Sequence, residues 1–279
     1  MSRIKIVTDS TSDIPKNIAE KYDIEVLPLT IFFGEDEYRD WLDITPSEFY
    51  ERMRKTDKLP TTSQVTPNAF VQVYETILKD YDEIISIHLS SHVSGTHNSA
   101  LLARDMVDKD KITVIDSKNY TYGYGQFVVE AARMAKEGKS SSEIVERVDY
   151  LKENLKTLFV VDTLEYLKKG GRLSATKATI GTLLNLKPVL TVDEGKIVAI
   201  DKARGFKKAL KRIVEIIQEE GSDLRGQVLK MGHADNYEHL RIFEEIVEET
   251  FGKCDIEEFE IGCVIGVYCG PGTVVIHYL

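Results

Sequence analysis

The sequence has few cysteines, and none of them lies in a pattern that forms a site. Its 279 residues include three: Cys254, Cys263 and Cys269. Three are too few for a disulfide framework, and they lack the CxxC spacing and the nearby histidines of a zinc site. We therefore expect free, buried thiols that pack as small hydrophobic side chains. The sequence predicts no metal and no cofactor.

Long apolar runs and an excess of positive charge are also missing. No stretch approaches the roughly 18 apolar residues of a membrane-spanning helix, and the first residues read as a strand, without the apolar core of a signal peptide. Against 46 acidic residues there are 36 basic ones, so the formal net charge is −10. This charge disfavours non-specific binding to nucleic acid or to an anionic membrane. We expect a cytoplasmic protein with no membrane span and no nucleic-acid partner.

Three catalytic or phosphate-binding motifs are absent as well. There is no P-loop, no GxGxxG segment follows a strand, and the residues around Ser94 lack GxSxG spacing. Two enzyme classes stay open as alternatives. One is a small-molecule phosphotransferase that uses a helix N-terminus, and the other is a hydrolase with Ser94 as nucleophile and His88, His92 or His97 as base.

What is present indicates a globular protein with a substantial core. Hydrophobic residues make up 42% and charged residues 29% of the chain, and the length suits two ordinary domains. In the first half, apolar strands at 4–8, 84–89 and 112–115 alternate with helical segments. This alternation predicts an N-terminal Rossmann-like α/β domain over residues 1–156, with a parallel sheet covered by helices on both faces.

The second half has a different rhythm. Segments 189–192 and 197–200 flank Glu194-Gly195 as a β-hairpin would. At the end of the chain, 264–268 and 273–277 read as two strands joined by the turn Cys269-Gly270-Pro271-Gly272. Directly joined strands predict a C-terminal α+β domain over residues 157–279 with a largely antiparallel sheet. We expect a small ligand at the junction of the two domains, where clefts usually bind ligands.

The most informative segment is Ser90-Ser91-His92-Val93-Ser94-Gly95-Thr96, which follows a strand and leads into a helix. The first N–H groups of a helix have no internal partners, and the helix dipole favours an anion there. Gly95 would let the backbone approach a ligand, while Ser94 and Thr96 offer hydroxyls. The alternative is that Ser94 simply caps the helix.

Two other segments could contribute to a site. Pro60-Thr61-Thr62-Ser63-Gln64 is a hydroxyl-rich loop, although such loops more often serve only as turns. Lys168-Lys169-Gly170-Gly171-Arg172 ends a helix and then presents a guanidinium that could bind a carboxylate or phosphate. For Arg172 the alternative is a solvated surface side chain.

In their order along the chain these segments resemble the DegV family of fatty acid-binding proteins, which includes the fatty acid-binding subunit of bacterial fatty acid kinase. The resemblance rests on Thr8-Asp9-Ser10 with Asp13, on the three segments just described, on Leu184-Asn185-Leu186-Lys187-Pro188 and on Gly270-Pro271-Gly272. Each motif is weak alone, but the ordered set spans essentially the whole chain.

The resemblance implies a monomeric lipid carrier, not an enzyme, that takes part in fatty acid metabolism. It would bind one long-chain fatty acid such as palmitate or stearate. The carboxylate-binding groups of the family fall on Thr62, Ser94 and the Gly95 backbone, with Arg172 near the head group. In some members a separate kinase phosphorylates the bound acid, and the basic residues Lys202 and Arg204, with Lys207 and Lys208, match the region expected to face it. From the residues alone these four are a solvated helix start. A purely regulatory protein with a structural lipid is a further alternative.

One position departs from the family pattern. Many members carry histidine two residues before the Gly-Pro-Gly turn, and here that residue is Tyr268. A phenol can donate one hydrogen bond to a carboxylate but stays neutral near pH 7, where histidine could be protonated. Fatty acid binding is therefore more compatible with Tyr268 than the phosphorylation role is.

The acyl chain is expected to provide most of the affinity. Burying about 15 methylenes at about 0.8 kcal/mol each offers roughly 12 kcal/mol before the cost of ordering the chain. Candidate residues for a buried tunnel follow the double glycine, where a helix is expected near 174–182. They are Ile180, Leu183, Leu184, Leu186 and Val189, and for each of them an ordinary place in the core is the alternative.

Overall fold

The computed structural model describes residues 2–56, 58–173 and 186–279. Contacts divide the chain into two compact units. The first unit comprises Met1–Thr45 and Pro60–Asn154, and the second comprises Pro46–Leu59 and Leu155–Leu279.

The first unit is built on a parallel sheet of four strands in the order β2-β1-β6-β7. Its strands are β1 (Ile4–Asp9), β2 (Glu25–Leu27), β6 (Glu83–His88) and β7 (Ile112–Asp116), and every neighbouring pair is parallel. All six residues of β1 are buried, as expected for a central strand covered on both faces. The predicted parallel sheet is confirmed.

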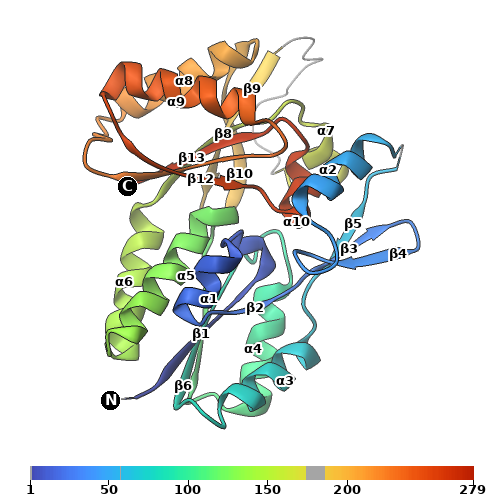
Figure 1. The fold of residues 1–279 in the computed structure, drawn as a ribbon, viewed down its shortest axis with the longest axis vertical. Coiled ribbons are helices and arrows are strands. Elements are labelled where there is room, and N and C mark those ends of the chain that lie inside the picture. Colours follow the sequence, from blue (N-terminus) through green and yellow to red (C-terminus); the bar gives the residue numbers. More distant parts are fainter. Residues whose placement is uncertain (1, 57, 174–185) are drawn as a thin grey trace. The chain divides into compact units, whose positions relative to one another are not determined.

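Helices cover both faces of this sheet. The chain crosses from β1 to β2 in one direction along the sheet and from β6 to β7 in the other, and right-handed crossovers in opposite directions place their helices on opposite faces. Helices α1 (Lys16–Tyr22), α5 (Thr121–Lys136) and α6 (Ser141–Asn154) lie on one side, while α3 (Pro67–Ile77) and α4 (Thr96–Val107) lie on the other (Figure 1). A short 3-10 turn, η1 (Ser10–Ser12), follows β1 directly.

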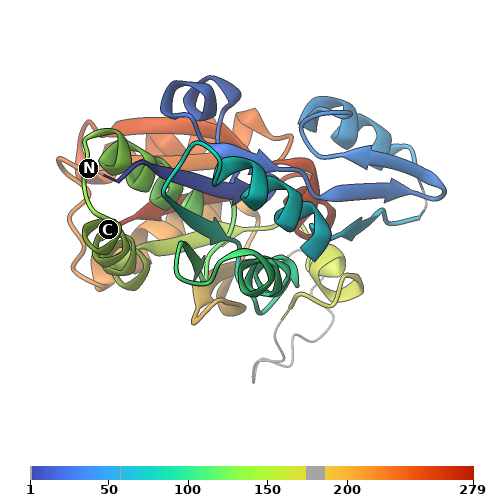
Figure 2. The ribbon, with the colours of Figure 1, turned by 90° about the horizontal axis from the view of Figure 1, so that it is seen from below.

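A second, antiparallel sheet of the first unit was not predicted from the sequence. Strands β3 (Thr30–Phe33), β4 (Asp36–Arg39) and β5 (Thr61–Ser63) pair in the order β4-β3-β5. The β3–β4 hairpin extends away from the parallel sheet of its unit (Figures 1 and 2). The segment 60–64, expected to be a loop, therefore contains a strand, and Thr62 pairs with Ile31 of β3.

The second unit contains a mixed sheet in the order β10-β9-β8-β13-β11-β12. Its strands are β8 (Lys156–Val160), β9 (Leu186–Asp193), β10 (Lys196–Arg204), β11 (Val228–His233), β12 (Asp255–Glu260) and β13 (Val274–Tyr278). Only β11 and β12 pair in parallel, so the sheet is largely antiparallel as predicted. Glu194 and Gly195 have φ of 44° and 77° and form the expected two-residue hairpin turn between β9 and β10.

Helices α8 (Phe206–Glu219) and α9 (Tyr237–Phe251) pack on this sheet and on each other. The buried side of α8 follows the helical period, with Phe206, Leu210, Ile213 and Ile217 facing the core. Two shorter helices, α2 (Pro46–Arg54) and α7 (Glu165–Lys169), complete the unit together with α10 (Cys263–Cys269).

The prediction of a strand at 264–268 is wrong, because this segment is helix α10. The run Val-Ile-Gly-Val-Tyr favours a strand by propensity, yet Gly266 packs against α2 so closely that an added Cβ would lie 2.5 Å from the Tyr50 hydroxyl. Packing against α2 decides the structure here. The turn at 269–272 consequently joins a helix to β13. The prediction of a largely antiparallel sheet is correct, but its reason, two strands joined directly at the end of the chain, is not.

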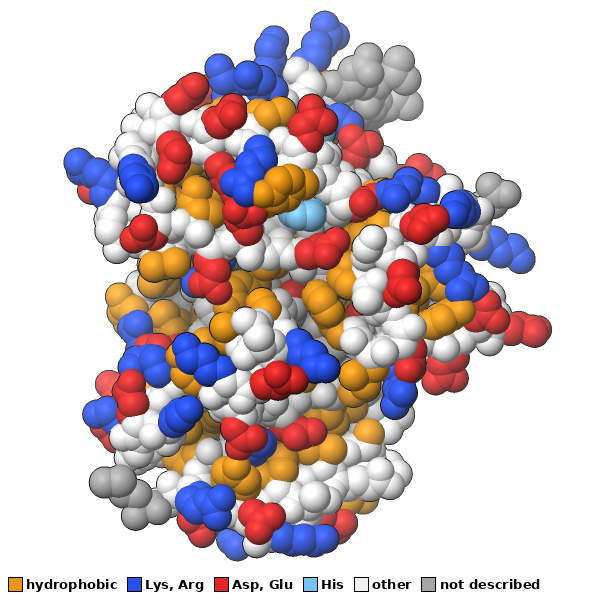
Figure 3. Space-filling model, in the orientation of Figure 1, with side chains coloured by type: hydrophobic (Ala, Val, Ile, Leu, Met, Phe, Trp, Pro, Cys, Tyr) orange, Lys and Arg blue, Asp and Glu red, His pale blue; other side chains and the backbone are white. Residues whose placement is uncertain are grey.

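None of the described helices is long and apolar enough to cross a membrane. Acidic and basic side chains are interspersed on the surface drawn in Figure 3, so the excess negative charge does not form one block there. The helix expected near 174–182 and the candidate tunnel residues Ile180, Leu183 and Leu184 lie outside the described residues.

Candidate functional site

The carboxyl ends of β1 and β6 form the switch point of the parallel sheet. From β1 the chain continues to β2 on one side, whereas β6 lies on the other side and continues outward to β7. In open α/β sheets, ligands bind where neighbouring strands diverge in this way. Asp9 ends β1, and the hydroxyl-rich loop 89–95 links β6 to α4.

Asp9 is a fully buried hub for hydrogen bonds at this point. Its Oδ1 accepts from the Thr11 N–H (3.1 Å), the Thr11 hydroxyl (2.5 Å) and the Tyr124 hydroxyl (2.9 Å). Its Oδ2 lies 2.8 Å from His88 Nδ1 and 3.4 Å from the Leu89 nitrogen. A buried carboxylate requires such compensation, and here it ties η1 and α5 to the end of β6.

His88 continues this network into the core. The Tyr74 hydroxyl donates to Ser86 Oγ (2.8 Å), and Ser86 Oγ lies 2.7 Å from His88 Nε2. Since Ser86 accepts from Tyr74, its own hydrogen can go to Nε2, which places the ring proton on Nδ1, facing Asp9. Burial raises the pKa of the Tyr74 phenol, so Tyr74 remains a hydrogen-bond donor.

This arrangement argues against the hydrolase alternative. Asp9, His88 and Ser86 have the composition of a catalytic triad, but all three are completely buried and no substrate can reach them. In the described part of the chain, the Ser94 hydroxyl forms hydrogen bonds only with Thr96 and none with a histidine. His88 therefore cannot serve as a base for Ser94.

Ser94 is not the N-cap of helix α4, because Gly95 occupies that position, but the Ser94 side chain does bond to the start of the helix. Its Oγ accepts from the Thr96 N–H at 3.2 Å and lies 3.0 Å from Thr96 Oγ1. The loop before it is held by Ser91, whose N–H and hydroxyl both donate to the Asp116 carboxylate. The next N–H groups belong to the first helical turn, where intrahelical acceptors are lacking. The loop is thus rigid, and it ends in donors that an anion could use.

Gly95 brings the segment that carries Thr62 to this loop. A Cβ on Gly95 would lie 1.9 Å from Gln64 Oε1, so the Gln64 amide rests directly on the glycine backbone. The same amide donates to Ser99 Oγ of α4 at 2.9 Å. Because Gln64 directly follows β5, this contact fixes the end of that strand beside the start of α4.

In the second unit, Arg172 and Tyr268 form a stacked pair. The Arg172 guanidinium lies 4.4 Å from the centroid of the Tyr268 ring, and its Nη1 donates to the Gly170 carbonyl at 2.6 Å. Such stacking and carbonyl bonding limit the orientations of an arginine side chain. Arg172 is therefore held in place and is not the freely solvated side chain of its alternative interpretation.

The double glycine and the Gly-Pro-Gly turn make this pairing possible. A Cβ on Gly170 would lie 2.4 Å from Tyr268 Cδ1, and a Cβ on Gly270 would lie 2.3 Å from Tyr166 Cδ2. Each glycine thus accommodates a tyrosine from the other helix, α7 or α10. Gly270 also has a φ of 75°, which other residues rarely adopt.

The remaining predicted residues lie elsewhere in the second unit. Lys202 and Arg204 are exposed on strand β10, so their assignment to a helix start is wrong, whereas Lys207 and Lys208 do lie in the first turn of α8. Leu186 begins β9 and is half-buried. Cys254, Cys263 and Cys269 are free and buried, as expected. Among the described residues, no cluster of His, Cys, Asp or Glu could hold a metal ion.

Sequence reasoning missed the structural roles of Gln64, His88 and Tyr166. Asp9 was noted only as part of a motif, and His88 only as a base for Ser94. One signal was available for the contact between Asp9 and His88. Each of these polar residues ends an apolar strand, and parallel strands place their carboxyl ends at the same edge of a sheet. No comparable signal exists for Gln64, because its contact is with the backbone of a glycine.

The chain is similar to known proteins along its whole length. The family model for uncharacterised proteins of the DegV family matches residues 3–279. A DegV domain-containing protein of Caldanaerobacter subterraneus subsp. tengcongensis is 42% identical over 278 residues, which is 100% of this chain and 99% of that protein.

Two solved structures share the fold. One is the structure of a DegV family protein from Thermus thermophilus, described in terms of its fatty acid binding. It has a TM-score of 0.90 and 34% identity, and the match covers 99% of this chain and 98% of that one. The other is a stearic acid-binding protein from Eubacterium ventriosum, with a TM-score of 0.86 and 31% identity, covering 98% and 97%. The family match and the identity along the full length lead to one conclusion: this chain belongs to the DegV family.

Proposed function

We propose that this chain binds one long-chain fatty acid and holds its carboxylate at the start of α4. The observation that carries the proposal is the rigid hydroxyl loop at the end of β6, located at the switch point of the parallel sheet. Relatives at 34% and 31% identity are described as binding a fatty acid and stearic acid. Their description supports the same ligand class for this chain.

The proposed head-group contacts in the first unit are Thr62, Ser94 and the Gly95 backbone. Ser94 Oγ accepts from Thr96 N–H, so its own hydrogen can be directed at a carboxylate oxygen. The positive end of the α4 dipole and the N–H groups of its first turn favour the same anion. The contact between Gln64 and Gly95 keeps the two hydroxyl-bearing segments in register.

From the second unit we propose Arg172 and Tyr268 as further head-group contacts. Arg172 uses Nη1 for the Gly170 carbonyl, and the other guanidinium N–H groups could donate to a carboxylate. The planar guanidinium fork matches the two oxygens of a carboxylate.

The acyl chain would supply most of the affinity through a buried tunnel. Ile180, Leu183, Leu184 and Leu186 remain the candidates that the sequence suggests for its lining. Hydrogen bonds to a charged head group, at about 1.5–3 kcal/mol each, would mainly fix orientation, against the roughly 12 kcal/mol available from about 15 methylenes.

The proposed role is that of a monomeric cytoplasmic carrier with no catalytic centre of its own. It would present the acid to a separate kinase that forms the acyl-phosphate. Lys202 and Arg204 are exposed and lie two residues apart on β10, so their side chains point to the same side of the strand. We propose them as docking residues for that kinase.

Mass spectrometry of the protein isolated from a bacterial host tests the carrier role. The expected result is about one equivalent of a long-chain fatty acid, released on denaturation. Lipid-free protein that also fails to take up a labelled fatty acid would rule out the proposal. Bound nucleotide in place of lipid would instead favour the phosphotransferase alternative.

Substitution of the hydroxyl groups tests the head-group site. Thr62→Ala and Ser94→Ala should each weaken fatty acid uptake several-fold and leave one equivalent bound at saturation. Thr76→Ala, which removes an exposed hydroxyl bonded only to its own helix in α3, is the matched control and should have no effect. Complete loss of binding from one hydroxyl would show that the head group, and not the chain, dominates the affinity.

A further inference from the structure

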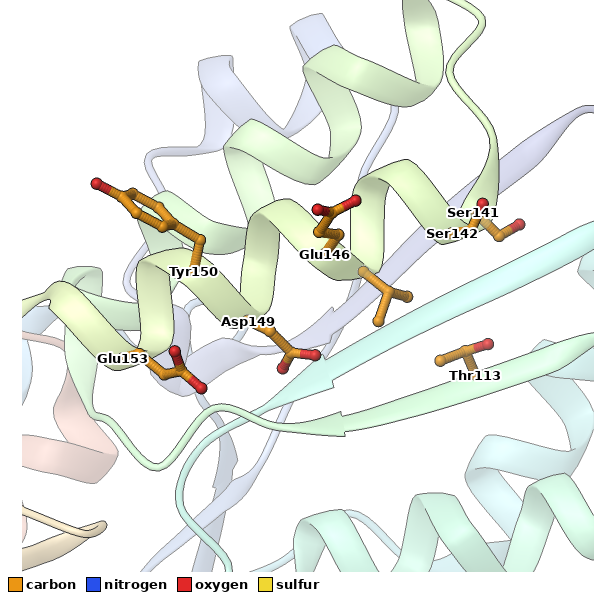
Figure 4. Close-up of a pocket in the computed structure, with 8 residues that line it drawn as sticks. Thr113, Ser141, Ser142, Glu146, Asp149, Tyr150 and Glu153 are labelled. Carbon is orange, nitrogen blue, oxygen red and sulfur yellow. The ribbon is translucent and has the colours of Figure 1, made fainter.

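A groove in the first unit lies apart from the proposed fatty acid site. It runs between helix α6 and strand β7 and has a volume of about 740 Å³ (Figure 4). The lining residues that matter are Thr113 of β7 and Val145, Glu146, Asp149, Tyr150 and Glu153 of α6. None of these residues takes part in the network at the carboxyl ends of β1 and β6.

Strand β7 is an open edge of the parallel sheet along this groove. It ends the strand order, and the described residues place no strand beyond it. Lys111 accepts from the Ile84 N–H and Ser117 donates to the His88 carbonyl, so the odd-numbered residues of β7 bond to β6. The N–H and C=O groups of Ile112 and Val114 therefore point outward. An extended peptide could pair with them.

The helix side of the groove is acidic. In the described part of the chain, Glu146 and Glu153 form no ion pair, whereas Asp149 is paired with Lys152 at 2.8 Å. Glu146 and Glu153 lie seven residues apart, which is about 10 Å along the helix. Lysine side chains at alternate positions of a strand are separated by about 7 Å, and their length allows them to reach both carboxylates.

The groove also offers apolar surface for the residues between those cations. Tyr150 is 52% exposed, and the Arg147 guanidinium lies 5.3 Å from its ring centroid, which restrains the ring. Val145 is half-buried beside it. A strand with cationic and β-branched residues in alternation would match both the carboxylates and this apolar surface.

Charge decides between two occupants of this edge. A second copy of the chain pairing through β7 would place Glu146 and Glu153 near the same residues of its partner, and like charges oppose such contacts. A cationic segment of another protein would gain from the same residues. The edge and its charges thus favour a heterologous partner.

We propose that this groove is a docking site for an extended, lysine- or arginine-rich segment of a partner protein, which adds to β7 as a fifth strand. Main-chain hydrogen bonds to Ile112 and Val114 would provide strand pairing, and Glu146 and Glu153 would select a cationic sequence. This interaction is independent of fatty acid binding.

A synthetic peptide of alternating lysine and valine provides the test, titrated into the isotope-labelled full-length protein at 150 mM salt. The expected result is saturable binding, with slowed amide hydrogen exchange at Ile112 and Val114. The same peptide with alternate backbone amides methylated keeps its charge but cannot pair, and it should bind at least tenfold more weakly. Equal binding of the methylated peptide would overturn strand addition.

Charge-matched variants test the role of the carboxylates. Glu146→Lys with Glu153→Lys should weaken binding at least tenfold, whereas Glu245→Lys with Glu249→Lys makes the same charge change on exposed positions of α9 and should have little effect. A similar loss in both variants would reduce the interaction to general attraction and contradict the proposal. Dimers of the free protein that the peptide dissociates would show that a second copy occupies the edge instead, which also overturns it.

Discussion

Asp9 shows how one residue can organise the loop on which the proposed site depends. Its carboxylate is bonded to the residues that follow β1 and to those that end β6, and these groups are about 80 residues apart in sequence. A buried acceptor with this many donors holds the two strand ends together only while all donors remain satisfied. The role of Asp9 is to position the loop, since it is fully buried and no ligand can reach it.

Replacing this carboxylate with an amide should be costly. Asp9→Asn exchanges one acceptor oxygen for an NH2 group and leaves buried donors without a partner, so we expect the free energy of unfolding to fall by about 3 kcal/mol. Urea unfolding measures the change. Asp80→Asn, at an exposed position of the same unit, is the control and should change stability by less than about 0.5 kcal/mol. A similarly small effect of Asp9→Asn would contradict the structural role.

His277 should make stability depend on pH. The ring is almost completely buried on β13, Nδ1 lies 2.9 Å from Thr157 Oγ1, and burial lowers the pKa of His277 to about 3. The unfolded chain has an ordinary histidine pKa of about 6.5. Between these values the unfolded state binds the additional proton, so this contribution lowers stability as the pH falls below about 6.5 and is absent above it.

The substitution His277→Asn keeps an acceptor for Thr157 but cannot be protonated. Urea unfolding between pH 5 and 7.5 should show that the wild-type protein loses up to about 1.4 kcal/mol per pH unit more than the variant below pH 6.5. The slopes are compared, because the variant also loses the stacking of His277 on Phe259. Parallel pH profiles would mean that His277 takes up its proton in the folded protein at the same pH as in the unfolded chain.

Among the helices and strands, those whose own hydrophobic pattern matches the structure they form could be predicted. Strands β1, β6 and β7 and the β9–β10 hairpin followed from apolar runs and from the Glu194-Gly195 turn. Strand β5 could not be predicted, since Thr61-Thr62-Ser63 has no apolar residue and pairs only because β3 lies beside it. Helix α10 was mispredicted because packing against α2 outweighs its β propensity.

For the candidate site, the hydroxyl-rich loop and the helix that follows it could be predicted, because their residues lie together in the sequence. The contacts that hold it could not. The bond between His88 and Asp9 and the packing of Gln64 on Gly95 join segments separated by many residues, and nothing in either segment alone specifies the other. Tyr268 was recognised as a departure from the family, but its stacking with Arg172 required the structure.

The close packing of α10 on α2 predicts that a side chain at position 266 lowers stability. Ala favours a helix over Gly by about 1 kcal/mol, yet in Gly266→Ala the Cβ would lie 2.5 Å from the Tyr50 hydroxyl and 2.9 Å from Phe49 Cε1. We expect a net loss of about 1–3 kcal/mol in the free energy of unfolding. Thermal and urea unfolding measure it.

A double-mutant cycle identifies the cause. Tyr50→Phe alone should be destabilising, because the Tyr50 hydroxyl donates to the Ile261 carbonyl at 2.9 Å. In that background Gly266→Ala should cost less, since the nearest clashing atom has been removed. Additive losses would show that the phenol oxygen is not what excludes a side chain at position 266.

At the scale of the whole molecule, a bound fatty acid should stabilise the folded state. Any ligand that binds only the native protein adds RT ln(1 + [L]/Kd), which is about 2.7 kcal/mol at a free concentration of 100 Kd. Delipidated protein should therefore unfold at lower urea concentration than protein saturated with stearate, and the gain should increase linearly with the logarithm of stearate concentration at the slope of a single site.

The methyl ester of the same acid separates the contributions of head group and chain. It keeps nearly all of the apolar surface but carries no charge for Thr62, Ser94 and Arg172, whose proposed hydrogen bonds are worth about 1.5–3 kcal/mol each when the acceptor is ionised. We expect the ester to stabilise the protein with an affinity at least tenfold lower than that of stearate. Equal stabilisation by acid and ester would mean that the protein binds an aliphatic ligand without recognising its carboxylate, and the loop at the start of α4 would then have only a structural role.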